Sequence, residues 1–597
     1  MPGSEPPGGP VDAPRTARAR LLAAVRRRAD VRDLLPSRSD YDLRPRTLRS
    51  DLLAGVTVGV VALPLALAFG VSSGVGPAAG LVTAVVAGVV AAVFGGSHLQ
   101  ISGPTGAMAV VLAPIVAQHG VGSVALVTLL GGALVLACGV LRLGRVVTYV
   151  PWPVVEGFTL GIAAIIFLQQ VPAAVGVAAE TGHNTLVTAV RSVGAALWPS
   201  GAVVDGTVVE GVVHGSGTPA WVWTLTVVAV VAVVMLVLPH VARALPASLV
   251  AVALVTVLAE VLHAPVPRIG ELPDALPLPV LPDATPALVR DLAGAALAVA
   301  ALAAIESLLS ARVAAGMSAE ADPDAPADAY HPDRELVGQG LASLASGVFG
   351  GIPATGAIAR TAVNVRTGAR TRLSAVVHAL VILAVIYLAT GPVGRIPLAA
   401  LAGVLMVTSF RMIGARTIRS VLASSRPDAL TFVVTAVVTV AFDLIVAVQI
   451  GLVVAAFFTL RSLARATSVH RDPLPGPARE GDEHIALFRI DGAMFFGAAD
   501  RILGEVTAAS VRDDVLVVVL RLSHLRVMDA TGGRALADLV AELERRGMTV
   551  LVKGVQPEHG KLLRAVGLRH AVRPDEAVEL ARARVREALL RGTRGEA

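Results

Sequence analysis

Residues 80–107 read GLVTAVVAGVVAAVFGGSHLQISGPTGA, and residues 340–357 read GLASLASGVFGGIPATGA. These stretches form an internal repeat, because each apolar run ends in Val-Phe-Gly-Gly and leads into a similar small-residue motif. The two motifs are Pro104-Thr105-Gly106-Ala107 and Pro353-Ala354-Thr355-Gly356-Ala357. They open apolar segments, 104–118 and 353–365, that are too short to cross a bilayer. Paired short segments of this kind predict broken helices whose N-termini lie inside the membrane.

The composition around these motifs is that of a polytopic membrane protein. The 597 residues are 55% hydrophobic and only 16% charged, whereas soluble domains carry roughly 25% charged residues. Twelve further apolar segments have transmembrane character. We place them at 51–71, 76–95, 122–141, 151–172, 220–239, 246–263, 289–311, 334–350, 373–391, 396–411, 428–442 and 444–464. With the two short segments the chain has fourteen.

The repeat divides the fourteen segments into two sets of seven, on either side of about residue 288. An odd number per repeat places the two halves in opposite orientations across the membrane. The N-termini of the two broken helices then face each other near the bilayer midplane, where unpaired N–H groups and helix dipoles attract an anion. The alternative is that Pro and Gly only mark packing kinks.

Arginines supply the orientation. With a cytoplasmic N-terminus, the loops after even-numbered segments hold most of the loop arginines, as the positive-inside rule requires. We therefore expect an inner (plasma) membrane protein with both termini cytoplasmic. Its N-terminal part, residues 1–48, would be a cytoplasmic Arg-rich tail. The net charge of +6 then reports topology, so a nucleic-acid partner is not expected. The single cysteine, Cys138, excludes disulfide frameworks and thiolate metal sites. No motif indicates an enzyme, a cofactor or a metal site.

Two charges inside the membrane part 49–465 narrow the candidate site. Glu306 lies late in the eighth segment, where a carboxylate is costly, and Ser310 follows one turn later on the same face. Arg360 lies in the second broken helix. An arginine beside an anion site can balance the charge of the substrate, and the carboxylate can carry a coupling proton. A purely structural Glu306–Arg360 ion pair is the alternative.

The chain turns soluble after a polar, Pro-containing linker at 466–482. Residues 483–590 are predicted to form a small α/β domain, followed by a short tail at 591–597. Its expected strands are 484–490, 514–520 and 548–553, and its expected helices are 498–509, 531–546 and 557–566. Asp529 and Thr531 stand at the start of the second of these helices, where helix capping alone accounts for both residues.

The chain resembles the SulP family of anion transporters, which includes sulfate permeases, bicarbonate and dicarboxylate transporters, animal anion exchangers and prestin. The specific motifs are Asp51-Leu-Leu-Ala-Gly through Phe69, Ser102-Gly-Pro-Thr-Gly106, Ile305-Glu-Ser-Leu-Leu-Ser-Ala311, Glu335 to Leu341, and Phe349 to Thr361. The C-terminal part resembles a STAS domain. The resemblance implies a 7+7 inverted repeat and a homodimer. It also implies elevator-like motion of a core against a gate domain, with substrate between the third and tenth segments.

The resemblance also assigns expected roles to individual residues. Thr105, Gly356 and Ala357 would line the anion pocket, alongside Gly106 and Ala107 of the same motif. Glu306, with Ser310, would be the coupling position and Arg360 the positive residue found in many members. Thr531 matches the phosphorylated position of STAS antagonist proteins, so Asp529 and Thr531 form a candidate regulatory turn.

The family motifs of this chain point to different branches of the family, and so to different substrates and coupling ions. The first three segments resemble the sodium-dependent bicarbonate branch, but that branch has Asp and Thr at Glu306 and Ser310. It also has a sodium-binding Thr where Ile358 stands. An apolar side chain and a nearby cation both disfavour bound Na⁺. We therefore expect proton-coupled or exchange transport of sulfate or bicarbonate, with C4-dicarboxylates behind them. Sodium-dependent bicarbonate symport, a channel-like conductance, and a membrane-anchored STAS sensor or scaffold stay open as alternatives.

Overall fold

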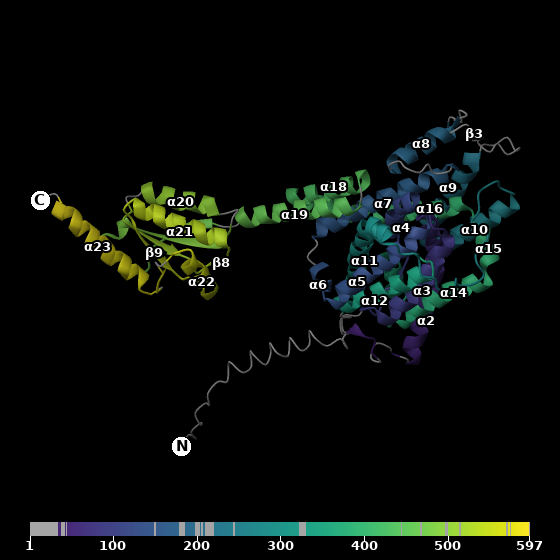
Figure 1. Cartoon of the computed structure of the whole chain (residues 1–597), viewed down its shortest axis with the longest axis horizontal. Helices are drawn as coiled ribbons and strands as arrows, with labels where there is room; N and C mark the ends of the chain where they lie inside the picture. The colour runs from purple at the N-terminus through teal and green to yellow at the C-terminus, as the bar shows by residue number, and fades with distance from the viewer. Residues whose placement is uncertain are drawn as a thin grey trace, which may run out of the picture. The chain divides into compact units, whose positions relative to one another are not determined.

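The computed structural model of the chain is shown in Figure 1. It describes residues 34–37, 42, 44–147, 151–177, 185–197, 203–204, 207–208, 220–242, 245–321, 330–442, 444–465, 468–495, 499–512, 515–568, 571–573 and 575–595. Most of the predicted Arg-rich tail lies outside these residues. The chain divides into two compact units, residues 1–451 and 452–597. The first is helical and apolar, and the second contains the C-terminal sheet.

Each of the fourteen predicted membrane segments coincides with a helix. The first seven are α2 (Pro45–Ser72), α3 (Pro77–Phe94), α4 (Gly106–His119), α5 (Gly122–Val140), α7 (Trp152–Ala174), α9 (Ala220–Val241) and α10 (Ala247–Val261). The second seven are α11 (Pro286–Ala321), α12 (Pro332–Val348), α13 (Ile358–Arg366), α14 (Leu373–Leu388), α16 (Leu398–Met412), α18 (Arg426–Ala441) and α19 (Leu444–Arg465). Seven stretches of the described helix are long and apolar enough to cross a membrane, judged by length and composition.

The structure adds short elements that the sequence reading omitted. They are α6 (Gly144–Val147), α8 (Thr185–Leu197), α15 (Thr390–Gly394), α17 (Ala415–Ser424), and the hairpin strands β2 (Val203–Val204) and β3 (Thr207–Val208). In addition, α11 continues to Ala321, ten residues past its predicted end. The extension is rich in alanine, which favours helix without making the segment more apolar.

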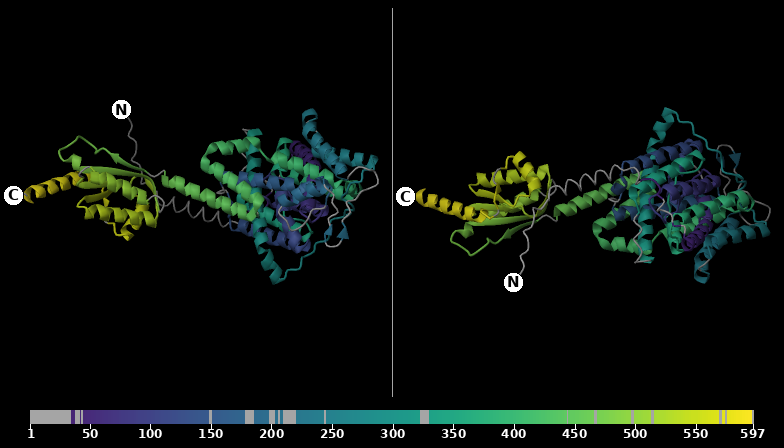
Figure 2. Two further views of the ribbon diagram at one scale, coloured as in Figure 1. Left: turned by 90° about the horizontal axis from the view of Figure 1, so that it is seen from above. Right: turned by 90° about the horizontal axis from the view of Figure 1, so that it is seen from below.

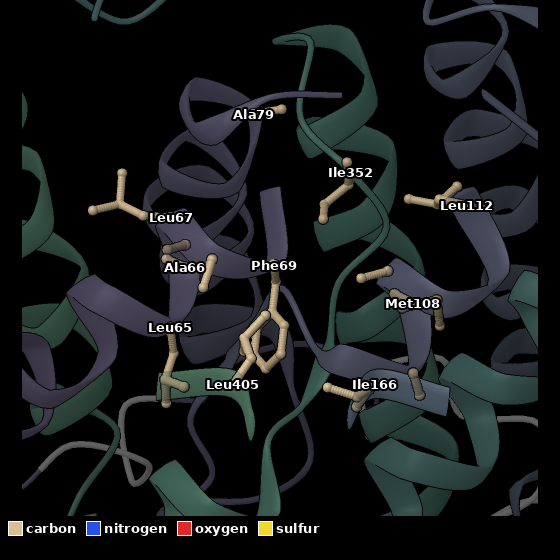
Figure 3. Packing of buried hydrophobic residues seen from close by; sticks show 14 of the residues in the cluster. Leu65, Ala66, Leu67, Phe69, Ala79, Met108, Leu112, Ile166, Ile352 and Leu405 are labelled. Atoms are coloured by element: carbon tan, nitrogen blue, oxygen red, sulfur yellow. The ribbon is translucent and has the colours of Figure 1, made fainter. Parts of the chain in front are cut away.

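Helix packing follows the inverted repeat. α5 packs against α11 and α12, and its repeat counterpart α14 packs against α2 and α3. Likewise α7 packs against α18, and its counterpart α16 packs against α9. The helices therefore form two groups, which we call the site group (α2–α5 and α11–α14) and the flanking group (α7, α9, α10, α16, α18 and α19). Buried apolar side chains join them: Phe69 of α2 lies near Ile166 of α7 and Leu405 of α16 (Figure 3).

Two short strands pair within the site group. β1 (Ser102–Gly103) pairs antiparallel with β4 (Thr355–Gly356), with Ser102 opposite Gly356 and Gly103 opposite Thr355. β1 precedes α4 and β4 precedes α13. Because the strands run antiparallel side by side, they bring the N-termini of the two broken helices together. This is the arrangement that the repeated Thr-Gly-Ala motifs predict.

The second unit is an α/β domain whose strands are β5 (Ser468–Asp472), β6 (Ile485–Met494), β7 (Val517–Arg521), β8 (Leu525–Met528), β9 (Thr549–Lys553) and β10 (Ala571–Val572). The sheet order is β10-β9-β7-β6-β5, and β8 also pairs with β6. Only β5 runs antiparallel to its neighbour. The sheet thus begins inside the stretch that the sequence reading assigned to the linker, since Val469 of β5 pairs with Ile490 of β6.

Helices cover both faces of this sheet (Figure 2). Alternate residues of β6 and β7 face opposite ways, so the sheet has two apolar faces. One face packs on residues of α20 (Ala499–Arg512), α21 (Ala530–Arg545) and α22 (Pro557–Ala565). The other packs on Ala577, Ala581 and Val585 of α23 (Ala577–Gly595). A one-turn 3-10 helix, Asp482–His484, leads into β6.

Candidate functional site

The first turns of the two broken helices have unused backbone donors. No described residue accepts a hydrogen bond from the N–H groups of residues 106–108 or 358–360. The N-cap residues are Thr105 for α4 and Ala357 for α13, and neither side chain caps its helix. A threonine at an N-cap usually accepts such an N–H. Two uncapped helix N-termini that meet at β1 and β4 therefore form a site suited to an anion.

The hydroxyl of Thr105 is committed to a carboxylate instead. Thr105 Oγ1 donates to Glu306 Oε2 at 2.9 Å, and Thr355 Oγ1 donates to the same oxygen at 2.8 Å. The two hydroxyls are 3.2 Å apart. Glu306 of α11 thus joins the N-terminal ends of both broken helices through one oxygen. Its other oxygen, Oε1, accepts no hydrogen bond from any described residue, and the side chain is only half-buried.

Arg360, the third residue of α13, is buried behind the paired strands. Its Nη2 donates to the carbonyl oxygen of Pro104 at 2.5 Å. Its Nη1 lies 2.8 Å from where a Cβ on Gly103 would stand, so there is no room for a side chain at this position. Gly103 also has a positive φ of +154°, which glycine adopts more readily than other residues. Arg360 and Glu306 form no ion pair in the described structure, so the structural pair considered as an alternative is not present. The arginine places its charge beside the first turn of α4.

Four of the remaining predicted site residues lie at the N-termini of the broken helices, and the fifth, Ser310, lies apart from them. Gly106 and Ala107 begin α4, and a Cβ on Gly106 would meet Ile166 and Phe69 (Figure 3). Gly356 and Ala357 precede α13, whose first residue, Ile358, is 39% exposed. Accessible space therefore reaches the N-terminus of α13. Ser310 forms no hydrogen bond with Glu306: it is fully buried, and its hydroxyl lies 3.2 Å from that of Thr361.

Several residues that hold the site together were absent from the sequence prediction. Ser307, next to Glu306, accepts the N–H of Gly356 at 3.1 Å. Thr355 occupies the same place in its motif as Thr105 does in the other, so the repeat itself was a usable signal. Gln100 is packed so closely on Gly356 that a Cβ there would overlap its amide nitrogen. Gly356 is therefore required by space, in addition to its backbone role.

A second buried carboxylate anchors the segment that leads into β1. Glu335 of α12 accepts hydrogen bonds from the N–H groups of Gly96 and Ser97, at 2.7 and 3.1 Å. It also accepts from the amide nitrogens of Gln100 and Gln339, both at 2.9 Å. Four donors on one buried carboxylate compensate its removal from water. Glu335 thus fixes the loop that carries Gln100 to Gly356.

The other repeat shows the reverse arrangement. Thr83 of α3 accepts the N–H of Ile352 at 2.7 Å, in the segment that leads into β4. Ser346 donates to the carbonyl oxygen of Ile352 at 2.7 Å and contacts Thr83. Each half of the chain therefore holds the loop that precedes the broken helix of the other half.

In the C-terminal domain, Asp529 is the N-cap of α21. Its carboxylate accepts the N–H of Gly532 at 2.7 Å, so the capping role that the sequence suggested is present. Thr531 is exposed in the first turn of the same helix. Across the described parts of both units, no group of three or more His, Cys, Asp or Glu side chains is arranged to hold a metal ion.

Comparisons with known proteins agree with this geometry. The model of the sulfate permease family matches residues 48–435, and the STAS domain model matches residues 477–581. YvdB of Bacillus subtilis, whose name describes it as a candidate sulfate transporter, is 33% identical over 534 residues, or 88% of this chain and 94% of that protein. The bicarbonate transporter BicA of Picosynechococcus is 30% identical over 568 residues, or 89% of this chain and 93% of that one.

Solved structures show the same fold. A structure of SLC26A9 superposes with a TM-score of 0.75 over 91% of this chain and 91% of that chain, at 15% identity. The transmembrane domain of a cyanobacterial BicA superposes with a TM-score of 0.56 at 30% identity, covering 69% of this chain and 98% of that one. The first resemblance spans both units, and the second spans the membrane part.

Proposed function

Because the chain belongs to the sulfate permease family, and is therefore a transporter rather than an enzyme, we propose that it carries sulfate or bicarbonate across the plasma membrane. The observation that carries this proposal is the pair of uncapped helix N-termini at β1 and β4. Six unused N–H groups converge there from two helices, and both helix dipoles are positive at that end. Sulfate and bicarbonate are small oxyanions that accept several such hydrogen bonds at once.

We further propose that Glu306 is the coupling residue. Both threonine hydroxyls donate to Oε2, which leaves Oε1 as the oxygen that can take a proton. When Glu306 is ionised, its charge opposes an incoming anion. When it is protonated, that opposition disappears and Oε1–H can donate to the substrate. A proton and an anion would then bind together, which supports symport with protons, or exchange where the proton step is absent.

The two helix groups support an elevator-like motion. The candidate site lies wholly within the site group, because α4, α11 and α13 supply its parts. Movement of that group past the flanking group would carry an intact anion site across the membrane. The apolar contact among Phe69, Ile166 and Leu405 is where the groups would slide. We also propose a homodimer with cytoplasmic termini, as the arginine distribution and the family resemblance imply.

The test is uptake of labelled sulfate and bicarbonate into proteoliposomes that contain the full chain, under imposed pH or Na⁺ gradients. We expect an inward proton gradient, with the outside more acidic, to drive anion uptake. Glu306→Gln should abolish the dependence of uptake on this gradient. Glu156→Gln is the matched control, because among the described residues Glu156 accepts a hydrogen bond only from Trp152, near the start of α7. Strict Na⁺ dependence would favour the alternative of sodium-dependent bicarbonate symport. Absence of flux for every anion tested would favour the sensor.

A further inference from the structure

Helix α17 carries a one-sided basic surface at the edge of the membrane unit. It joins α16 to α18, so it lies where the chain leaves and re-enters the bilayer. Arg416 and Arg419 are exposed and stand one turn apart on the same face. The buried residue of the helix, Val421, lies on the opposite face, and α17 packs against α18 and α7. The arginines therefore point away from the protein.

These positive charges have no acidic partner. Within the described part of the chain, neither Arg416 nor Arg419 forms an ion pair or a side-chain hydrogen bond, and the same holds for exposed Arg426 at the start of α18. The nearest acid along the chain, Asp428, accepts from the hydroxyls of Ser424 and Ser425. Exposed arginines elsewhere are often neutralised, as Arg545 and Arg546 are by Glu542.

Exposed apolar side chains lie in α17 and at the end of the helix before it. Leu422 of α17 is 47% exposed, and Phe410 and Met412 at the end of α16 are 67% and 38% exposed. A short helix with arginines on one side and apolar residues beside them is the pattern of a helix that lies in the headgroup region of a bilayer. An acidic soluble protein would match the arginines but would leave the apolar side chains in water.

We infer that α17 is a docking site for anionic phospholipid headgroups of the surrounding bilayer. Arginine binds phosphate through two parallel N–H groups, and Arg416 and Arg419 are free to do so together. The apolar side chains would sit among the upper acyl chains. Each arginine near an anionic surface contributes about fivefold in lipid affinity, so the pair contributes roughly 25-fold. The inference does not depend on which anion is transported.

The test uses the purified full-length protein in a nonionic detergent, titrated with phosphatidylglycerol or phosphatidylcholine while the thermal unfolding midpoint is followed. Phosphatidylglycerol should raise the midpoint more than phosphatidylcholine, and high salt should reduce the difference. Arg416→Gln/Arg419→Gln should weaken the apparent affinity for phosphatidylglycerol about 25-fold. Arg416→Lys/Arg419→Lys should keep the part of this affinity that comes from charge and lose what the two parallel N–H groups add. Without lipid, both variants should unfold near the wild-type midpoint, because these side chains form no hydrogen bond or ion pair with the part of the chain that the structure describes.

The rival site is the Arg-rich tail, tested with Arg26→Gln/Arg27→Gln. If the tail variant loses the phosphatidylglycerol response and the α17 variant keeps it, the assignment to α17 is wrong. An equal response of the wild-type protein to both lipids would also overturn it, because charge would then play no part. Loss in the α17 variant alone supports the proposal.

Discussion

Replacing Glu335 by Gln tests whether the buried carboxylate sets the geometry of the anion site. The carboxylate receives two donors on each oxygen: Gly96 and Ser97 on Oε2, and Gln100 and Gln339 on Oε1. A glutamine has one acceptor oxygen, so its NH2 group faces either the two peptide N–H groups or the amides of Gln100 and Gln339, whose own oxygens accept no hydrogen bond in the described structure. While both amides keep their present orientation, in which Gln339 also donates to Ser102, two buried donors are left unsatisfied, at about 1–3 kcal/mol each. We therefore expect Glu335→Gln to destabilise the membrane unit by about 2–6 kcal/mol.

The effect should reach the site through Gln100, which lies against Gly356, and through Ser102, whose hydroxyl accepts from Gln339 at 2.6 Å. The assay compares unfolding of the full chain in detergent with anion uptake in proteoliposomes. Glu335→Gln should lower the unfolding midpoint and raise the KM for the anion. The control Glu156→Gln keeps an acceptor oxygen for Trp152 Nε1 and should change both values little. If the two variants unfold alike and transport alike, Glu335 does not position the site.

Three further predictions follow from single contacts. Gly356→Ala should abolish anion uptake because its Cβ would overlap Gln100, whereas Gly294→Ala in α11 should be tolerated because nothing lies within 4 Å of the new methyl. Thr355→Val removes one donor to Glu306 and should reduce uptake about tenfold or more, since hydrogen bonds to charged groups are worth about 1.5–3 kcal/mol; unchanged uptake at pH 6 and pH 8 would contradict this role. In the C-terminal domain, the hydrogen bond from Arg582 lowers the pKa of Asp482. The ionised form therefore stabilises the fold above the unfolded pKa of about 4, and this stability is lost as the pH falls through the lower folded value. Asp482→Asn should accordingly make this domain easier to digest at pH 7, with the difference from wild type shrinking below about pH 4, as limited proteolysis would measure.

The membrane architecture was predictable because hydropathy, proline and glycine are local signals. The repeated motifs predicted the broken helices. The antiparallel pairing of the strands before them, with Ser102 opposite Gly356, agrees with the opposite orientations of the two repeats. Helix α8 was missed since its thirteen residues mix apolar and polar side chains, which resembles a loop in a scan for long apolar runs. Strand β5 was missed since Ser468–Asp472 is mostly polar and its pairing partner comes later in the chain.

The supporting contacts of the site could not be read from one sequence. Glu335 and Gly96 are separated by 239 residues, and no local pattern tells which helix face will meet which loop. Arg360 shows the same limit in another way. Its position in the broken helix was apparent, but its guanidinium turns back to the carbonyl of Pro104 rather than to Glu306. Side-chain direction in a packed interior depends on neighbours contributed by the other repeat.

The exchange of loop contacts between the halves has a consequence for biosynthesis. Thr83 and the residue it holds, Ile352, are 269 residues apart. At about 5–20 residues per second, a ribosome needs roughly 15–50 s to make that interval. For most of that time the loop after α3 has been made but its acceptor, Glu335, 239 residues beyond Gly96, has not. The newly made first half therefore lacks the contacts that hold its loop, and the insertion machinery must protect it from misfolding. Neither half can complete its fold until the ribosome has passed the second motif.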